Sequence, residues 1–303
     1  MRRLIVTADD FGMARFIDRG IALALTDGLV NTVSAMMTFA RSDDALADLL
    51  RAHPQARVGL HLCLTAGVPC APRKEVPSLL DEAGYFFPLE VFLARFPRMD
   101  HGEIFHELSA QVAAFRRVCR SLDHLSYHQN AMALHPQGFR LVMQLARVHQ
   151  VPIRVPVGSS RQDQRRFQSR GTRPKTVAVA LKASSHNPFS TARLFPHVQV
   201  PMWRYRLRKL RASGIRHPDH FIDNFYGDPS PANLLDIFRH LPVGTCELLT
   251  HPGMPPYDDP LPHGLDSDFV RPREAELATL LSPYLRQELD RLGIELCGFQ
   301  DLT

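Results

Sequence analysis

Cysteine is scarce in this chain, and its pattern argues against a disulfide framework or a cysteine-rich zinc site. The five cysteines among 303 residues are odd in number and form no Cys-x-x-Cys pair. Most of them lie among apolar neighbours, which is typical of buried thiols in a reducing compartment. We therefore expect unpaired cysteines and a cytoplasmic location.

Long apolar segments are also absent. No stretch approaches the ~18 consecutive apolar residues that suffice for a transmembrane helix. The first residues enter a predicted strand directly, without the apolar core of a secretory signal. We expect a protein with no membrane span.

Nucleotide-binding glycine motifs are missing too, and the charge is weak. Neither a Gly-x-Gly-x-x-Gly segment nor a Walker segment is present, so no nucleotide-binding fold is predicted. The formal net charge is +5, and much of it lies in residues 161–175 and 204–211. Neither stretch matches a nucleic-acid module, so we interpret both as solvated surface and expect no nucleic-acid partner.

What the chain does contain is a regular alternation of β-rich apolar runs and amphipathic helical segments. We expect strands at 3–8, 31–36, 57–63, 122–127, 151–155, 219–222, 245–250 and 294–299, and helices near 15–28, 41–53, 103–120, 136–149, 230–240 and 271–292. Repeated βα units of this kind predict an α/β protein with a parallel sheet. About eight strands in this length favour a TIM-like (β/α) barrel, closed or incomplete, over an open doubly wound sheet.

Two long stretches interrupt the alternation within what we expect to be a single domain over residues 1–303. Residues 64–100 are rich in proline and glycine, and residues 157–215 are basic and irregular. Long loops on a barrel usually carry binding function. We therefore expect both stretches to be loops or insertions of this one domain.

The segment Thr7–Gly12 places two adjacent aspartates directly after the apolar run Leu4–Val6. Successive residues of a regular strand point to opposite faces, and neighbouring carboxylates repel unless a cation or a shared proton holds them. One interpretation is a turn with two solvated aspartates. The other is a site in which one carboxylate binds a metal and the other acts as a base.

Further polar residues follow the other predicted strands at the same end. His61 lies near the end of the third strand and His128 follows the fourth, while Arg154 ends the fifth and His251 follows the seventh. A single histidine of this kind is more often structural than catalytic. Their convergence with the aspartates on the rim where barrel enzymes place their chemistry favours a metal hydrolase.

These segments resemble the YdjC-like carbohydrate deacetylases, which include chitooligosaccharide deacetylases. The matching segments are TADDFG at 7–12, VGLHLCLTAGVP at 58–69, VPSLLDEAGYF at 76–86, LDHLSYHQNAMALHP at 122–136, VPIRVP at 151–156, HPDHFIDNFYG at 217–227, CELLTHPG at 246–253, RPREAEL at 271–277 and GIELCGFQDL at 293–302. They occur in family order from residue 1 to about residue 302, whereas residues 157–215 carry little that matches.

The resemblance implies a barrel related to the polysaccharide deacetylases, a homodimer and a divalent metal, generally magnesium, with zinc as an alternative. Carried over by position, Asp10, His61 and His128 would be the metal ligands. The substrate would be an N-acetylated carbohydrate such as a chito-oligosaccharide.

The same resemblance implies that Asp9 is the general base and His251 the general acid. Hydrolysis of an N-acetyl group needs an activated water, a polarised carbonyl and a proton for the departing amine, which these residue types supply. Arg154, the third candidate catalytic residue, would keep a site carboxylate ionised or form a structural salt bridge at the rim.

One position departs from the family pattern. Many relatives carry a second histidine two residues after the metal-binding one, whereas this chain has His128, Gln129 and Asn130. If that histidine faces substrate, the Asn130 amide still offers hydrogen bonds. If it completes the coordination sphere, the affinity for metal or the identity of the metal would change.

Two other classes of function fit the same residues. A metal-dependent phosphosugar isomerase or phosphatase would use the basic stretches 161–175 and 204–211 as an anion site. A catalytically idle sugar-binding protein would need no paired base and acid, so the presence of both Asp9 and His251 argues against it.

Overall fold

The computed structural model describes residues 1–156, 166–167, 206–256, 260–265 and 270–303. The described strands are β1 (Arg2–Phe11), β2 (Thr32–Ala35), β3 (Val58–Leu62), β4 (Leu125–Tyr127), β5 (His220–Ile222), β6 (Gly244–Thr250) and β7 (Ile294–Leu296). The described α-helices are α1 (Arg15–Thr26), α2 (Ser42–Ala52), α3 (Leu89–Arg95), α4 (His101–Val118), α5 (Ala131–Leu134), α6 (Pro136–His149), α11 (Pro231–Arg239), α12 (Val270–Leu280) and α13 (Pro283–Arg291).

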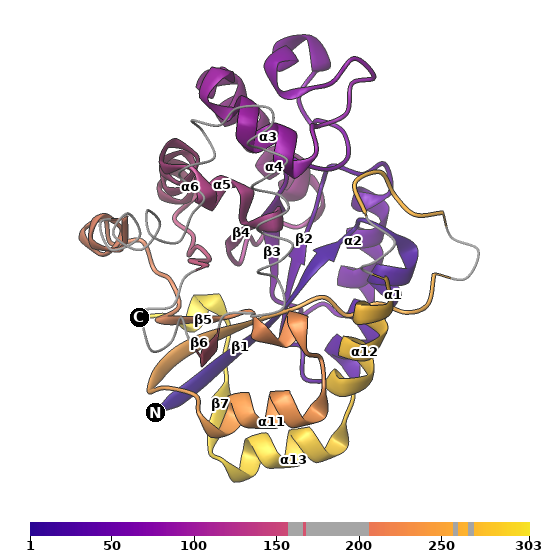
Figure 1. Ribbon diagram of the computed structural model, residues 1–303, viewed down its shortest axis with the longest axis vertical. Coiled ribbons are helices and arrows are strands. Elements are labelled where there is room, and N and C mark those ends of the chain that lie inside the picture. The colour runs from indigo at the N-terminus through magenta and orange to yellow at the C-terminus, as the bar shows by residue number, and fades with distance from the viewer. Residues whose placement is uncertain (157–165, 168–205, 257–259, 266–269) are drawn as a thin grey trace.

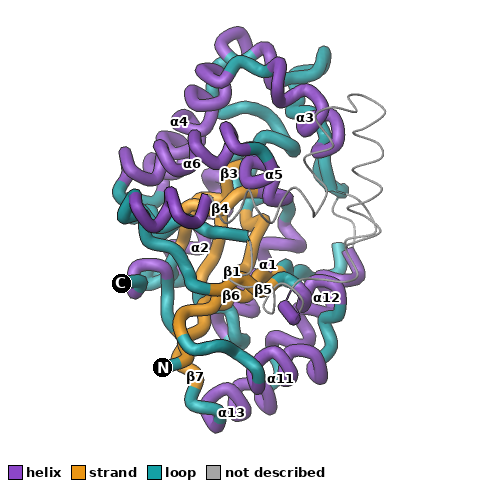
Figure 2. Tube along the Cα trace, turned by 60° about the vertical axis from the view of Figure 1, so that its left-hand side comes forward, coloured by secondary structure: helices purple, strands orange, loops and turns teal. Residues whose placement is uncertain are grey.

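The strands form one parallel sheet that curls into part of a barrel. Its order is β4-β3-β2-β1-β6-β5, and β7 pairs with the first residues of β1. The sheet occupies the centre of the molecule, and the helices surround it (Figures 1 and 2). The prediction of an α/β fold with an incomplete TIM-like barrel is therefore confirmed.

Alternation along the strands separates an apolar outer face from a polar inner face. On β1, Leu4, Val6 and Ala8 belong to the main apolar core, together with outward residues of the neighbouring strands and the inward faces of the helices. Because successive side chains alternate, the residues between them face the interior of the barrel. That interior carries buried hydroxyl, imidazole and carboxylate groups, which a purely structural core would avoid.

The end of the barrel where the strands begin is closed by the C-terminal segment. Ile5, Cys297, Phe299 and Leu302 form a separate small apolar cluster. Asn31 ties the same region together, since its side chain accepts from Val6 N and donates to Cys297 O. This plug leaves the opposite end, where the strands finish, as the place for a site.

The expected strand at 151–155 is wrong, because only Ile153 pairs, through an isolated parallel bridge to Leu125. Leu125 N donates to Pro152 O, and Arg154 N donates back to Leu125 O. The prolines at 152 and 156 lack the N–H that a continuing ladder needs. The segment therefore follows the edge of β4 without extending as a strand.

The expected helix at 271–292 is also wrong, because two helices occupy it. Helix α12 ends at Leu280, and α13 begins at Pro283 after Ser282 at the N-cap position. Proline is favoured in the first turn of a helix and disfavoured in its interior, which explains the break.

The stretch 64–100 contains α3 and three short 3₁₀ turns at Arg73–Glu75, Pro77–Leu79 and Phe96–Arg98. Glu107 of α4 anchors its start, because its carboxylate accepts hydrogen bonds from Cys70 N and Ala71 N. Most of 157–215, including the basic stretch 161–175 except residues 166–167, lies outside the described residues.

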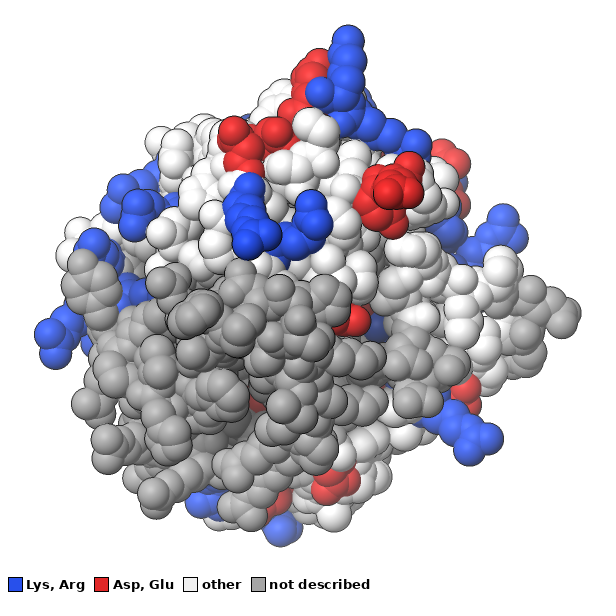
Figure 3. Space-filling view, turned by 45° about the horizontal axis from the view of Figure 1, so that its top comes forward, with Lys and Arg blue, Asp and Glu red and all other residues white. Residues whose placement is uncertain are grey.

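No helix in the described part of the chain is long and apolar enough to cross a membrane. Acidic and basic side chains are interspersed, not gathered by sign, over the described part of the face in Figure 3.

Candidate functional site

A bulge in β1 turns both aspartates toward the same side. Ala8 pairs with Val33 and Phe11 pairs with Ala35, so β1 has one residue more than β2 between these pairs. Asp10 has a φ of 71°, in the left-handed region that aspartate tolerates better than most residues. A bulge changes the direction in which nearby side chains point. Here Asp9 and Asp10 therefore do not point to opposite faces, as they would in a regular strand.

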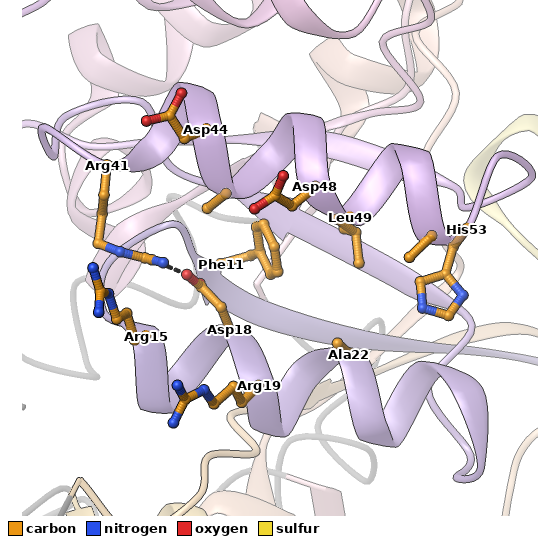
Figure 4. A pocket seen from close by; sticks show the side chains of 12 residues that line it. Phe11, Arg15, Asp18, Arg19, Ala22, Arg41, Asp44, Asp48, Leu49 and His53 are labelled. Atoms are coloured by element: carbon orange, nitrogen blue, oxygen red, sulfur yellow. Dashed lines mark hydrogen bonds and ion pairs between the residues drawn. The ribbon is translucent and has the colours of Figure 1, made fainter.

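The turn after Asp10 is held from the surface by α1 and α2. Asp18 of α1 accepts a hydrogen bond of 2.6 Å from Gly12 N and forms an ion pair with Arg41. Both side chains line a groove of about 470 Å³ between the two helices (Figure 4). Asp9 and Asp10 are not among the residues that line this groove, so we assign the groove a structural part in fixing the turn.

Asp10, His61 and His128 form a compact buried group. Each residue offers one ligand atom, and these three atoms lie within 4.8 Å of one another. Nδ1 of His128 lies 2.9 Å from Oδ1 of Asp10, and Nε2 of His61 lies 3.5 Å from the same oxygen. The structure thus brings together the three residues that the family resemblance names as metal ligands.

The other aspartate lies against the same imidazole. Oδ2 of Asp9 is 3.7 Å from Nε2 of His61. Burial lowers the pKa of His61 to about 3 and outweighs the two carboxylates, so this imidazole is neutral and has a lone pair to offer a cation.

Arg154 fixes Asp9 through two hydrogen bonds, from Nη1 to Oδ2 at 2.5 Å and from Nη2 to Oδ1 at 2.9 Å. Its Nε also donates to Oε1 of Glu247 at 2.7 Å. Burial by itself raises the pKa of Asp9, but Arg154, helped by His61, outweighs burial and lowers it to about 2. Asp9 is therefore a fixed carboxylate that stays ionised.

Two residues of α12 complete the surroundings; both lie in the matching segment 271–277, but neither was predicted as a site residue. Arg273 Nη2 donates to Oδ2 of Asp10 at 2.5 Å, and Glu276 accepts a hydrogen bond of 2.5 Å from His251 N. Burial raises the pKa of Asp10, but His128 and Arg273 outweigh it and hold that pKa well below its ordinary value. Their spacing of three residues on one helix, within the matching segment 271–277, was the available signal.

His251 stands at the edge of the group, where its side chain is partly exposed. Its Nδ1 lies 3.8 Å from Oε1 of the fully buried Glu276, and its ring packs edge-on against Tyr226 with ring centroids 4.8 Å apart. The distance from Nδ1 to Oε1 is too long for a hydrogen bond, and Nδ1 has no hydrogen-bond partner among the described residues, so Glu276 holds this histidine through its backbone N–H.

The buried charges around the group suit a divalent cation. Asp9 and Glu247 pair with the guanidinium of Arg154, Asp10 pairs with that of Arg273, and Glu276 lies beside His251, so the four carboxylates and two guanidinium groups carry a formal charge of −2. Nε2 of His128 is buried and has no hydrogen-bond partner among the described residues. An unsatisfied buried nitrogen in a group with an excess of carboxylate charge fits a metal ligand set.

Asn130 adopts a left-handed backbone with a φ of 52°, directly after Gln129 at 53°. Asparagine tolerates this conformation, so the substitution for the family histidine is compatible with the turn that follows His128. The effect of the missing histidine on metal binding stays a prediction.

The fold and the site define a parallel α/β half-barrel with an Asp-His-His group near the ends of its strands. The sequence pattern of YdjC-like proteins matches residues 3–291, and the chain belongs to this family. The predicted family is therefore confirmed.

Full-length relatives share this pattern. A carbohydrate deacetylase of Geobacillus stearothermophilus is 30% identical over 302 residues, which are 99% of this chain and 98% of that one. A chitooligosaccharide deacetylase of Yersinia pestis is 29% identical over 303 residues, which are 98% of each chain.

A crystal structure from Enterococcus faecalis, described as a cellobiose-phosphate cleavage protein, has a TM-score of 0.74 to this chain. It covers 99% of this chain and 98% of its own length at 23% identity, so it supports the fold alone.

Proposed function

We propose that this protein is a divalent-metal-dependent hydrolase that removes N-acetyl groups from carbohydrates of the chito-oligosaccharide type. The observation that carries the proposal is the buried group of Asp10, His61 and His128 beside the fixed carboxylate of Asp9. The names of the full-length relatives support the reaction and the substrate class.

Asp10, His61 and His128 would hold the cation, which when bound would polarise the acetyl carbonyl and acidify water. Two imidazoles and one carboxylate suit zinc as well as magnesium, so the proposal keeps magnesium with zinc as the alternative. The divalent charge matches the formal −2 of the surrounding side chains.

Asp9 takes the proton that the attacking water loses. Its pKa of about 2 makes it a weak base, so it suits an acidified water and not ordinary solvent. Arg154 positions both carboxylate oxygens and keeps them ionised. A fixed base of this kind loses no free energy to reorientation during the reaction.

His251 gives a proton to the sugar nitrogen as the C–N bond breaks, so that acetate and a free amine leave. Its partly exposed position beside buried Glu276 supports this part, because an acid must reach the substrate and be reprotonated from solvent. The general-acid and general-base assignments both follow from the roles that the family resemblance implies.

The test is acetate release from diacetylchitobiose and a panel of N-acetylated sugars, using metal-stripped protein reloaded with magnesium or zinc. We expect metal-dependent release that is lost in Asp9→Asn and in His128→Ala. Phosphate release or isomerisation of a phosphosugar, without acetate release, would favour the phosphosugar alternative instead. Binding of the sugars by metal-loaded protein without any turnover would favour the idle sugar-binding alternative.

A further inference from the structure

A chain of hydrogen bonds runs through the barrel interior away from His61. Nδ1 of His61 lies 2.8 Å from Oγ of Ser126, which donates to Oγ of Ser34 at 2.9 Å. Oγ of Ser34 lies 2.9 Å from Nε2 of His124, and Nδ1 of His124 lies 3.0 Å from Oδ2 of Asp123. Asp123 is thus four hydrogen bonds away from the metal-site imidazole.

The members of this chain are buried and come from three neighbouring strands and the segment before β4. Ser34, His124 and Ser126 have no exposed surface, and His61 and Asp123 are 1% and 4% exposed. Buried polar groups are costly unless they are paired, so a fully connected chain of this length is a specific feature of the interior.

The surroundings of His124 are shaped to hold its ring in place. A Cβ at residue 59 would lie 2.3 Å from the ring, so only glycine leaves room there. Phe299 stacks on the ring with centroids 3.9 Å apart and an interplanar angle of 12°. Gln300 donates from its side chain to the carbonyl oxygen of Asp123. Residues of the C-terminal segment therefore pack against the end of the hydrogen-bond chain that lies away from His61.

The carboxylate at that end fixes the direction of every hydrogen bond in the chain. An ionised carboxylate only accepts, so His124 carries its proton on Nδ1 and presents an accepting Nε2 to Ser34. Ser34 then donates to His124, Ser126 donates to Ser34, and the oxygen of Ser126 is left to accept from Nδ1 of His61. In this direction every hydroxyl and imidazole proton has an acceptor.

We propose that Asp123, His124, Ser34 and Ser126 are positioning residues that set His61 in the Nδ1–H tautomer. Nε2, the nitrogen that faces Asp9 and Asp10, is then unprotonated and free to bind the cation. Hydrogen-bond partners behind a metal-binding histidine commonly fix its tautomer and orientation. This inference rests on the proposed metal site, but it assigns a task to four residues that the proposed reaction does not use.

Ser34→Ala tests the chain at a point that does not touch His61. Without the Ser34 hydroxyl, Ser126 has no acceptor in the chain and can donate to Nδ1 of His61, which places the imidazole proton on Nε2. Asp123→Ala removes the terminal acceptor and acts in the same direction. Thr245→Val is the matched control, because this buried hydroxyl on β6 has no hydrogen-bond partner among the described residues.

The first readout is the tautomer of His61 in metal-free protein, from nitrogen-15 NMR of histidine-labelled samples, with the signal assigned by His61→Gln. We expect Nδ1–H in the wild type and in Thr245→Val, and a population of Nε2–H in Ser34→Ala and Asp123→Ala. An Nε2–H imidazole in the wild type, or Nδ1–H unchanged in both variants, would overturn the inference.

The second readout is the dissociation constant for zinc, measured by calorimetry on variants that keep the wild-type circular dichroism spectrum. We expect about tenfold weaker binding in Ser34→Ala and Asp123→Ala, and no change in Thr245→Val. Unchanged zinc affinity in both Ser34→Ala and Asp123→Ala contradicts the inference while leaving the deacetylase proposal intact. Absence of zinc and magnesium binding in the wild type defeats the deacetylase proposal, whereas the NMR readout still decides the tautomer.

Discussion

Arg154 donates hydrogen bonds to both carboxylate oxygens of Asp9, at 2.5 and 2.9 Å, and its Nε donates one to Glu247. All three side chains are buried. Among the described residues, Glu247 has no ion-pair partner other than Arg154, and Asp9 has only Arg154 and the nearby His61. Removing Arg154 affects the stability of the fold and the protonation of the proposed base together.

Arg154→Met is expected to lower the free energy of unfolding by about 3–5 kcal/mol, because it leaves two buried carboxylates without their cation. Urea denaturation of the metal-free protein measures the change. Arg291→Ala is the control, since that arginine pairs with Glu288 at the surface and its loss should leave the free energy of unfolding close to the wild-type value. If both variants lowered the free energy of unfolding by the same small amount, Arg154 would not be stabilising the buried carboxylates of Asp9 and Glu247.

The free energy of unfolding of the metal-free protein is expected to decrease as the pH is lowered below 6.5. The folded state keeps His61 neutral down to about pH 3, whereas the unfolded chain takes up a proton near 6.5. The unfolded state therefore binds more protons in this window, and the free energy of unfolding falls by up to about 1.4 kcal/mol per pH unit. Asp9 adds a loss of the same sign only between about pH 4 and 2, because its folded pKa is depressed.

Urea denaturation at several values between pH 6.5 and 4.5 isolates the contribution of His61. His61→Gln should show a shallower dependence of unfolding free energy on pH than the wild type. A His61→Gln slope identical to the wild type would contradict the assignment of the neutral buried imidazole.

Glu276→Gln is expected to lower kcat while KM stays close to wild type. The carboxylate positions His251 but is not part of the Asp10, His61 and His128 group. The loss should be smaller than that of His251→Ala, for which the removal of a general acid predicts about 10²–10⁴-fold. Steady-state kinetics on both variants measure this, and a kcat of Glu276→Gln equal to that of the wild type would contradict the positioning of His251 by Glu276.

Much of the fold followed from local patterns that tertiary contacts reinforce. The strand carrying Asp9 and Asp10 and the strand ending near His61 lie where their apolar runs predicted them. The strand at 151–155 did not form, since a segment flanked by prolines cannot donate a continuous ladder. Its arginine nevertheless reaches the site, because one bridge at Ile153 suffices to hold the segment beside β4.

The site residues at the ends of strands could be predicted from the sequence, whereas those that come from a helix could not. Arg273 and Glu276 come from α12, and neither periodicity nor composition says which face of a helix meets the barrel rim. Glu247 did leave a signal, as an acidic residue in the middle of the apolar strand β6. The bulge that turns Asp10 depends on the register between β1 and β2, which a single strand does not encode.

The most direct test of the metal-dependent deacetylase proposal is a titration of magnesium or zinc into metal-stripped protein, with bound metal and acetate release from diacetylchitobiose followed together. The account predicts that acetate release rises with bound metal and levels off at one equivalent per chain, and that His128→Ala shows neither. Full acetate release by the stripped protein, or one equivalent of bound metal with no release from any N-acetylated sugar, would contradict it.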